Sequence, residues 1–491
     1  MHFSLKRLAS TLGLSSQGES PVLVQPGWNG LPEDIFILIL KDYLGVNSAA
    51  ANSLSQTCRA YAFFSRPHLL RSVCITEGIR PRTRIEQFQH DLKHSPQLHT
   101  AVGALRIVND RINDRDLGMH FQKSGQRGPS LTKTGEKLVY ILSRHFPNMT
   151  VFELPRLQRD QQWATLSLKL QDAVCDFLCR HARGSLQELS ISTHYPLELV
   201  RHCSSITKLE YMIDELDVKL ESVDSSLLGI HKSENSDPIS LKELAILDTF
   251  SSVSTDVAKR FTELGNEPCV SLKELERLTY YGDNWHWSHL RVFLAYCATT
   301  LSSLRIIVSD RLNGPKLDLS SFRRLKHLSL SMNRMSLGSC TLSWIASTIK
   351  DLYDPPNTTS TRIPPVQTLE VVVKALGRTA KENIRDMEQG LITPMLESFR
   401  KAASVSTAKG RPRRTWVLKE LRVVVCVERR LLAHVGPSGE EQRTLVSDMR
   451  KLLVDSLSTF DPSVAVDVEL VEGEFHKWLR YPSIPRAPFH Y

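Results

Sequence analysis

Leucine and other aliphatic residues recur along most of the chain at one short spacing. The pattern Leu-x-x-Leu-x-aliphatic occurs strictly five times and more loosely another five times. Alternation of apolar and polar residues over a few positions predicts a strand with one buried face. The strict copies are Leu186/Leu189/Ile191, Leu241/Leu244/Ile246, Leu301/Leu304/Ile306, Leu325/Leu328/Leu330 and Leu418/Leu421/Val423, and the looser copies are Val102/Leu105/Ile107, Met149/Phe152/Leu154, Ile206/Leu209/Tyr211, Leu272/Leu275 and Val366/Leu369/Val371.

Amphipathic stretches with helical spacing lie between many of these copies, at 138–146, 173–183, 257–264, 290–298 and 442–457. A strand followed by a helix, many times over, predicts parallel strands joined by crossover helices. We therefore expect an α/β fold, either as a repeat array or as an ordinary α/β domain with leucine-rich strands.

The N-terminal part carries a different pattern, which begins at Leu31. Pro32 has a backbone angle suited to a first helical turn, and the two acids after it complement the helix dipole. The next six residues, 35–40, are apolar on every side. Such a helix needs two apolar neighbours, of which one can be a partner protein. A buried parallel strand is the alternative. Further helical spacing at 48–64 and the segment 67–75 complete a candidate three-helix unit.

These residues resemble an F-box, whose pattern has Leu-Pro, spaced Ile and Leu, then Cys-Arg and an aromatic residue. Tyr61 stands where many F-boxes carry Trp, and Leu70 stands where a closing Trp is usual. The resemblance covers about a tenth of the chain. The matching positions are Leu31-Pro32, Ile35, Ile39, Leu44, Leu54, Thr57-Cys58-Arg59, Tyr61, and Pro67 with Leu69-Leu70.

The F-box resemblance implies a partner and a function. It implies docking on a Skp1-like protein, and through it on a cullin, in an SCF-type ubiquitin ligase. Cys58 and Tyr61 are expected to support the core of the F-box. The residues that the resemblance assigns to Skp1 contacts are Leu31, Pro32, Ile35, Ile39, Leu44 and Leu54.

The rest of the chain resembles the irregular leucine-rich-repeat arrays found behind many F-boxes, especially fungal ones. The unit Leu325-x-x-Leu328-x-Leu330-x-x-Asn333-x-Met335 is similar to the full repeat signature. The resemblance implies a curved solenoid of parallel strands with outer helices. The expected organisation is a disordered tail (1–30, or a mitochondrial presequence near its start), an F-box (31–76), a repeat solenoid (77–480) with flexible insertions near 109–132, 221–240, 353–365 and 403–415, and a tail (481–491).

Period-two alternation assigns a face to each strand residue. Leu189 and Ile191 point inward, so Ser190 and Ser192 are expected on the opposite, concave side with Ala245, Leu247, Arg305, Ile307, Ser329, Ser331, Glu370, Val372, Arg422 and Val424. This mixture of polar and apolar residues suits a protein ligand better than a polyanion. The expected substrate-binding residues are Tyr281, Trp285, Arg305, Ser329, Glu370 and Arg422, of which Tyr281 and Trp285 belong to the aromatic segment 280–287. That segment can instead be the start of a helix that caps the core.

Composition excludes several classes of protein. The 491 residues are 41% hydrophobic and 23% charged, close to ordinary globular proteins. The net charge of +9 is modest for this length and does not argue for nucleic acid. Nine scattered cysteines without framework spacing favour a reducing compartment, cytoplasmic or nuclear. No apolar run approaches the about 18 residues that span a bilayer, so no membrane partner is expected.

A group of cysteines and histidines and two charged segments indicate a function less specifically. Cys175, Cys179 and His181 with His202-Cys203 match no standard zinc spacing and are expected to be core thiols. The basic loop 409–414 is expected to be a solvated loop, with a nuclear import signal or a contact with an acidic partner as the alternatives. The acidic segment 221–239 is expected to be a disordered insertion, with a phosphorylation site as the alternative. Because the usual enzyme motifs are missing, we expect no catalytic residue, no cofactor and no metal. The prediction is a substrate-recognition adaptor, and the alternative is a leucine-rich-repeat scaffold without a ubiquitin-ligase link.

Overall fold

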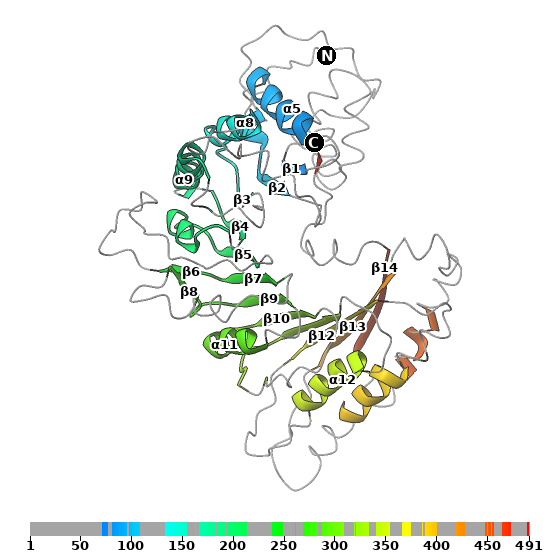
Figure 1. Cartoon of the computed structure of the whole chain (residues 1–491). Helices are drawn as coiled ribbons and strands as arrows, with labels where there is room; N and C mark the ends of the chain where they lie inside the picture. Colours follow the sequence, from blue (N-terminus) through cyan, green and yellow to red (C-terminus); the bar gives the residue numbers. More distant parts are fainter. Residues whose placement is uncertain are drawn as a thin grey trace, which may run out of the picture. The chain divides into compact units, whose positions relative to one another are not determined.

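The computed structural model of the chain forms two compact units (Figure 1). The first contains strands β1–β4 and β15, and the second contains β5–β14. The structure describes residues 71–76, 81–95, 98–108, 133–154, 163, 166–182, 185–192, 194–213, 238–248, 261, 269–282, 287–308, 319, 321–332, 340–353, 366–374, 385, 388–399, 418–427, 447–448, 450–452, 454–455, 464–472 and 489–490.

The first unit is a parallel sheet with helices between its strands. Its described strands lie in the order β4-β3-β2-β1-β15, and every pair is parallel. The helices α5, α8 and α9 pack side by side along it (Figure 1). The strands are β1 (Ser72–Thr76), β2 (Ala104–Val108), β3 (Val151–Glu153), β4 (Glu188–Ser192) and β15 (Phe489–His490), and the helices are α5 (Pro81–His94), α6 (Leu98–Ala101), α8 (Lys133–Leu142), α9 (Leu168–Ala182) and the 3-10 helix η2 (Leu197–His202).

The second unit is a longer parallel sheet whose strand order follows the chain, β5-β7-β9-β10-β11-β12-β13-β14. Each strand therefore pairs with the next one of the sheet, as in a stack of repeats. The strands are β5 (Lys208–Ile213), β7 (Glu243–Asp248), β9 (Arg277–Gly282), β10 (Ser303–Val308), β11 (His327–Met332), β12 (Thr368–Lys374), β13 (Glu420–Val427) and β14 (Ala465–Glu472), with a separate pair β6 (Ile239–Ser240) and β8 (Val270–Ser271).

Helices of the second unit lie along one side of its sheet (Figure 1). They are α11 (Trp287–Cys297), α12 (Cys340–Tyr353) and the π-helical turn η5 (Glu388–Ile392), which continues as α-helix through 393–399. The rings of Tyr211 on β5, Phe261 and Phe293 on α11 follow one another at 5.3 and 5.5 Å between centroids. Aromatic contact thus joins the sheet to its helices. In the first unit, Phe152 on β3 contacts Phe177 on α9 at 4.6 Å in the same way.

The leucine pattern forms two buried rows that run across the second sheet. Since neighbouring strands pair without a register shift, the second leucine of every copy lies beside its equivalent. Burial of one such side chain contributes about 1.5–3 kcal/mol. One row is Leu209, Leu244, Leu278, Leu304, Leu328, Leu369 and Leu421, and the next is Tyr211, Ile246, Tyr280, Ile306, Leu330, Val371 and Val423, all buried.

The residue just before each strand makes the same backbone hydrogen bond to the preceding copy. The N–H groups of Lys242, Glu276, Ser302, Lys326, Gln367 and Lys419 each donate to the preceding copy over 2.8–2.9 Å. The first leucine of each copy, such as Leu241, Leu301 or Leu325, is fully buried beside this bond. The repeated spacing in the sequence therefore corresponds to a repeated backbone geometry.

The α/β class with a long parallel sheet is confirmed, and each predicted copy corresponds to one strand from β2 to β13. The pattern places one copy three residues too early: Leu275, Leu278 and Tyr280 occupy the register positions expected of the Leu272/Leu275 copy. The pattern does not predict the short strands β6, β8 and β15, nor the longer strands β1 and β14. β1 lies in the segment assigned to the F-box, and β14 begins after Ser463, where the pattern expects leucine. α5 and α12 were also missed.

Several predicted segments lie outside the described residues. These are the F-box residues 31–70, the insertions 109–132, 354–365 and 403–415, and the tail 1–30. Within the insertion expected near 221–240, Ile239–Ser240 form β6, and the final tail contains β15. No helix in the described part of the chain is long and apolar enough to cross a membrane.

Candidate functional site

The side of the second sheet opposite the leucine rows carries most of its charged residues, and we call it the polar face. It consists of the strand residues that alternate with the leucine rows in β5–β14. Because the strands are in register, these side chains also form rows. The central row contains Glu210, Ala245, Thr279, Arg305, Ser329, Glu370, Arg422 and Asp467.

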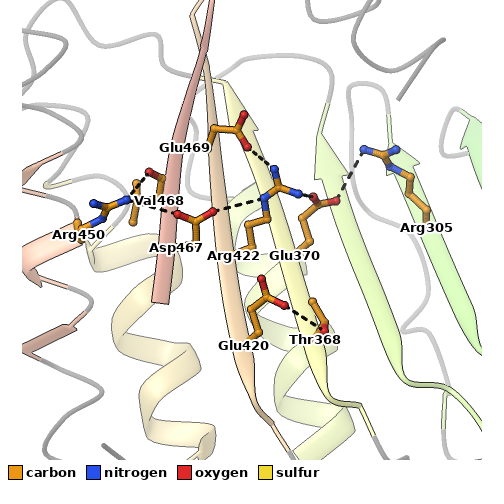
Figure 2. Close-up of polar contacts among 9 residues, drawn as sticks. All are labelled: Arg305, Thr368, Glu370, Glu420, Arg422, Arg450, Asp467, Val468 and Glu469. Atoms are coloured by element: carbon orange, nitrogen blue, oxygen red, sulfur yellow. Dashed lines mark hydrogen bonds and ion pairs between the residues drawn. The ribbon is translucent and has the colours of Figure 1, made fainter. Parts of the chain in front are cut away.

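Arg422 on β13 is the centre of an ion-pair network at one end of the polar face (Figure 2). Its guanidinium lies 3.4 Å from Glu370 on β12 and 3.7 Å from Asp467 on β14. It also donates a hydrogen bond to Glu469. Burial opposes the charge of Arg422, but Glu469, Glu370 and Asp467 together raise the pKa of the guanidinium above its usual value. The arginine thus connects three strands through charge.

Glu370 extends the network toward β10. The hydroxyl of Ser329 on β11 donates to it over 2.5 Å, and Arg305 on β10 lies 3.7 Å away on the far side of β11. The carboxylate of Glu370 therefore forms ion pairs with two arginines and accepts a hydrogen bond from one hydroxyl. The side chains of Arg305 and Glu370 are 14% and 16% exposed, whereas that of Arg422 is 38% exposed. Arg422 is the part of this group most accessible to a ligand.

The network continues to the last strand of the sheet. Arg450, from the helical residues before β14, lies 3.4 Å from the carboxylate of Asp467 and donates to the backbone carbonyl of Val468 (Figure 2). The side chains of Arg450 and Asp467 are about half exposed. Asp467 therefore lies between two arginines at the rim of the polar face.

A second, smaller group lies on the first strands of this sheet. Glu243 on β7 accepts from Arg277 on β9 over 2.7 Å and pairs with Lys208 on β5 at 3.4 Å. Exposed pairs of this kind contribute little to stability, with a typical value of about 0.2–1 kcal/mol. Their positive and negative groups alternate from strand to strand, so the face carries no large potential of one sign.

Apart from Glu469 on β14, the third row of the polar face is largely apolar and buried. Ile307, Ser331, Val372 and Val424 are fully buried, and Tyr281 in the same row is half-buried. The predicted alternation is confirmed, because these side chains lie opposite the leucine rows. The expectation that Ile307, Ser331, Val372 and Val424 belong to a ligand-binding surface is wrong, because their burial leaves the other two rows and Glu469 as the accessible part of the face.

The equivalent face of the first unit contains a largely buried group of charged side chains. Arg106 on β2 lies 3.3 Å from Glu153 on β3 and 3.4 Å from Glu188 on β4. The side chains of Arg106 and Glu153 are each 5% exposed. Ser190 and Ser192 are fully buried, although the sequence predicted an accessible surface there. This face is therefore part of the interior of the first unit.

The structure brings four of the six predicted substrate residues into one network. Arg305, Ser329, Glu370 and Arg422 are linked by hydrogen bonds and ion pairs, while Tyr281 lies on the same face on β9. Trp285 lies outside the described residues, as do all the predicted Skp1 contacts. The alternative for the aromatic segment is confirmed in part, because α11 starts at Trp287 and buries Leu290, Phe293 and Leu294.

Sequence reasoning missed Asp467, Glu469 and Arg450. The signal for the first two is the alternation of valines with acids in 466–469, which predicts a strand with an acidic face. The leucine pattern does not extend to this strand, because the copy lacks its first leucine. Nothing local marks Arg450, because its role depends on where the helix before β14 lies.

The cysteine and histidine cluster of the first unit does not gather around a common point. Cys179 Sγ lies 3.0 Å from His202 Nδ1, but His181 is turned inward and packs on phenylalanine rings. Burial raises the pKa of Cys175 to about 12 and also raises that of Cys203. Both thiols are therefore protonated at neutral pH. Among the described residues, no group of three or more His, Cys, Asp or Glu could hold a metal ion.

A scan of the chain against protein-family models finds no match, and a search of the curated proteins finds no similar protein. The F-box and leucine-rich-repeat resemblances therefore remain predictions from the residues themselves.

Proposed function

We propose that the chain is the substrate-recognition adaptor of an SCF-type ubiquitin ligase. In this proposal the segment 31–76 is an F-box that docks on a Skp1-like protein, and through it on a cullin. The following sheets form a leucine-rich-repeat-like solenoid that binds a protein substrate. The chain itself supplies no catalytic group.

One observation carries the proposal: the leucine pattern forms an in-register parallel sheet whose strand order follows the chain. In a repeat array each copy buries its aliphatic residues against the next, and the residues between them form a long surface of similar positions. The second unit has this arrangement from β5 to β14. Such surfaces bind extended or folded protein partners.

The chemistry of the polar face supports a protein ligand. It combines partly exposed arginine, glutamate and aspartate with hydroxyl groups, so it offers donors and acceptors of both signs. A polyanion would require an uncompensated row of basic side chains. Arg422 is the best candidate for a direct contact, because it is 38% exposed and arginine is common among the residues that dominate protein interfaces.

The proposed mechanism is proximity. An adaptor that holds a substrate next to a ubiquitin-charged enzyme raises the effective concentration of the two reactants without an acid, base or nucleophile of its own. The rate gain depends on both contacts being made at once. Loss of either contact should therefore abolish substrate ubiquitination.

Co-purification tests the F-box contact. The tagged full chain should recover Skp1 from cells, and Leu31→Ala/Pro32→Ala should abolish the recovery, because it removes apolar contacts of the proposed interface. The matched control Leu5→Ala/Pro21→Ala changes the same residue types in the N-terminal tail and should recover Skp1 normally. Circular dichroism should show unchanged secondary structure in both variants.

The alternative is a repeat scaffold whose N-terminal helices recruit no ligase. It is favoured by the same polar face, since protein binding requires no F-box. No recovery of Skp1 by the native chain would support the scaffold. Proximity labelling with the proteasome blocked would then identify partners in either case, but under the adaptor proposal those partners should accumulate only while the proteasome is inhibited.

A further inference from the structure

The last strand of the second sheet, β14, presents backbone groups on its outer side. In the described part of the chain β14 pairs with β13 alone. A parallel strand directs the N–H and C=O of every second residue to the same neighbour. The N–H of Ala465 donates to the carbonyl of Lys419, the residue just before β13. The backbone N–H and C=O groups of the odd-numbered residues of β14 therefore point toward β13. The backbone groups of Val466, Val468 and Leu470 therefore point to the outer edge.

Arg450 acts at this edge. Its guanidinium donates to the carbonyl of Val468, one of the outward groups, and pairs with the carboxylate of Asp467, each at 3.4 Å (Figure 2). A side chain that bonds both groups occupies the position that the backbone and a basic side chain of a further strand would take. An exposed edge strand is also a template for pairing with another chain, which proteins commonly block with charged residues.

The charges of the polar face specify what a further strand should carry. Across the central row, Arg305, Glu370, Arg422 and Asp467 alternate in sign, with Ser329 between the first two. The next position in this series is beside Asp467 and should be basic. Glu469, two residues along and 43% exposed, favours a second basic residue on the same side of the strand.

We propose that the outer edge of β14 is a docking site for an extended peptide strand with basic residues at alternate positions, and that Arg450 covers this edge until the strand adds. The backbone of the peptide would pair with Val466 and Val468, and its basic side chains would meet Asp467 and Glu469. A second copy of the chain fits poorly, because two β14 strands would bring Asp467 and Glu469 of each copy together. The proposal is independent of the F-box.

Fluorescence anisotropy with the full chain tests this site. The probe is a labelled ten-residue peptide of alternating valine and lysine, which should bind saturably. The same peptide with N-methyl groups on alternate backbone amides keeps the charges but loses hydrogen-bond donors, and its binding should be lost. Equal binding of both peptides would overturn the proposal, because only charge would then be needed. A valine and glutamate peptide should not bind.

Variants of the protein test the roles of the two side chains. Arg450→Ala should tighten binding of the lysine peptide several-fold, because it removes the competing group. Asp467→Asn should weaken binding roughly two- to fivefold, the range of an exposed charge pair, and less so at high salt. Unchanged affinity in Arg450→Ala, or dimerisation of this variant in sedimentation experiments, would contradict the proposed occupant. Skp1 recovery should be normal in both variants, so failure here is distinct from failure of the adaptor proposal.

Discussion

The two units place the same pair of residues in the same register position and use them differently. In the first unit Arg106 and Glu153 follow buried core residues on β2 and β3, and both side chains are 5% exposed. In the second unit Glu370 and Arg422 follow leucines on β12 and β13 and are 16% and 38% exposed. The first pair is therefore part of the interior, while Arg422 of the second pair is accessible to a ligand. Residue type and spacing alone do not distinguish these roles.

The largest expected effect is the loss of one partner from the buried pair. Arg106→Ala removes the ion pairs that the carboxylates of Glu153 and Glu188 make with Arg106, and the side chain of Glu153 is 5% exposed. The free energy of unfolding should fall by about 3–5 kcal/mol. Urea denaturation at pH 7 measures it.

The triple variant Arg106→Met/Glu153→Leu/Glu188→Leu is the matched control for that prediction. It replaces all three charges by apolar groups of similar volume, and such replacements are often neutral or stabilising. It should therefore lose much less stability than Arg106→Ala. If both variants lose the same amount, packing of the arginine side chain rather than its charge is what stabilises the first unit.

The next largest effect is a pH dependence of the free energy of unfolding of the first unit. Burial, with repulsion from His145 and Arg180, lowers the pKa of His181 from 6.5 to about 4. The neutral ring accepts the backbone N–H of Phe146 over 3.5 Å. As the pH falls, His181 takes up a proton in the unfolded chain at a higher pH than in the folded chain. The neutral ring therefore contributes its full stability to the first unit at neutral pH, and this contribution is lost as the pH falls from about 6.5 toward 4. Each pKa unit corresponds to about 1.4 kcal/mol.

Urea midpoints at pH 7 and pH 5 test this prediction. His181→Phe should make the first unit less sensitive to acid, because a phenyl ring fits among the neighbouring aromatic rings and takes no proton. The control His90→Phe changes an exposed histidine on α5 and should keep the acid sensitivity of the native chain. Equal acid sensitivity in His181→Phe and the native chain would assign the effect to other groups.

A smaller effect is expected for Arg422→Ala in the second unit. Its ion pairs are partly exposed, so the loss of stability should be about 1 kcal/mol, well below that of Arg106→Ala. Binding of a protein partner by the polar face should nevertheless fall strongly. A partner-capture assay together with urea denaturation separates the two quantities. A loss of stability as large as that of Arg106→Ala would remove the contrast between the units.

The smallest effect is expected at Glu243. Glu243→Gln removes the charge that pairs with Lys208 and Arg277, but Arg277 is 55% exposed and the pairs are screened by salt. The change in unfolding free energy should stay below about 1 kcal/mol and should vanish in 1 M salt. A larger change that persists at high salt would show that this group is part of the interior, like Arg106.

The sequence predicts the leucine rows well, because their spacing reports directly on buried positions. Leu304, Leu328 and Leu421 lie in register as expected. The sequence does not predict exposure on the other face, because that depends on which segments cover it. Ser190 is buried and Arg422 is half-buried, although both alternate with buried aliphatic residues of their strands.

The role of Arg450 was also unpredictable, since no local pattern reports that a helix residue contacts the backbone of a later strand. The placement of β14 failed for a different reason, because Ser463 replaces the leucine that marks other copies. Local spacing thus predicts the repeated core, and contacts between segments decide the site.

The most direct test of the adaptor proposal uses purified components. The full chain and Skp1 are mixed and analysed by size-exclusion chromatography with light scattering. The proposal predicts a one-to-one complex with the summed mass of the two proteins, which Leu31→Ala/Pro32→Ala abolishes and Leu5→Ala/Pro21→Ala retains. Two separate peaks for the native chain, with each protein at its own mass, would contradict it.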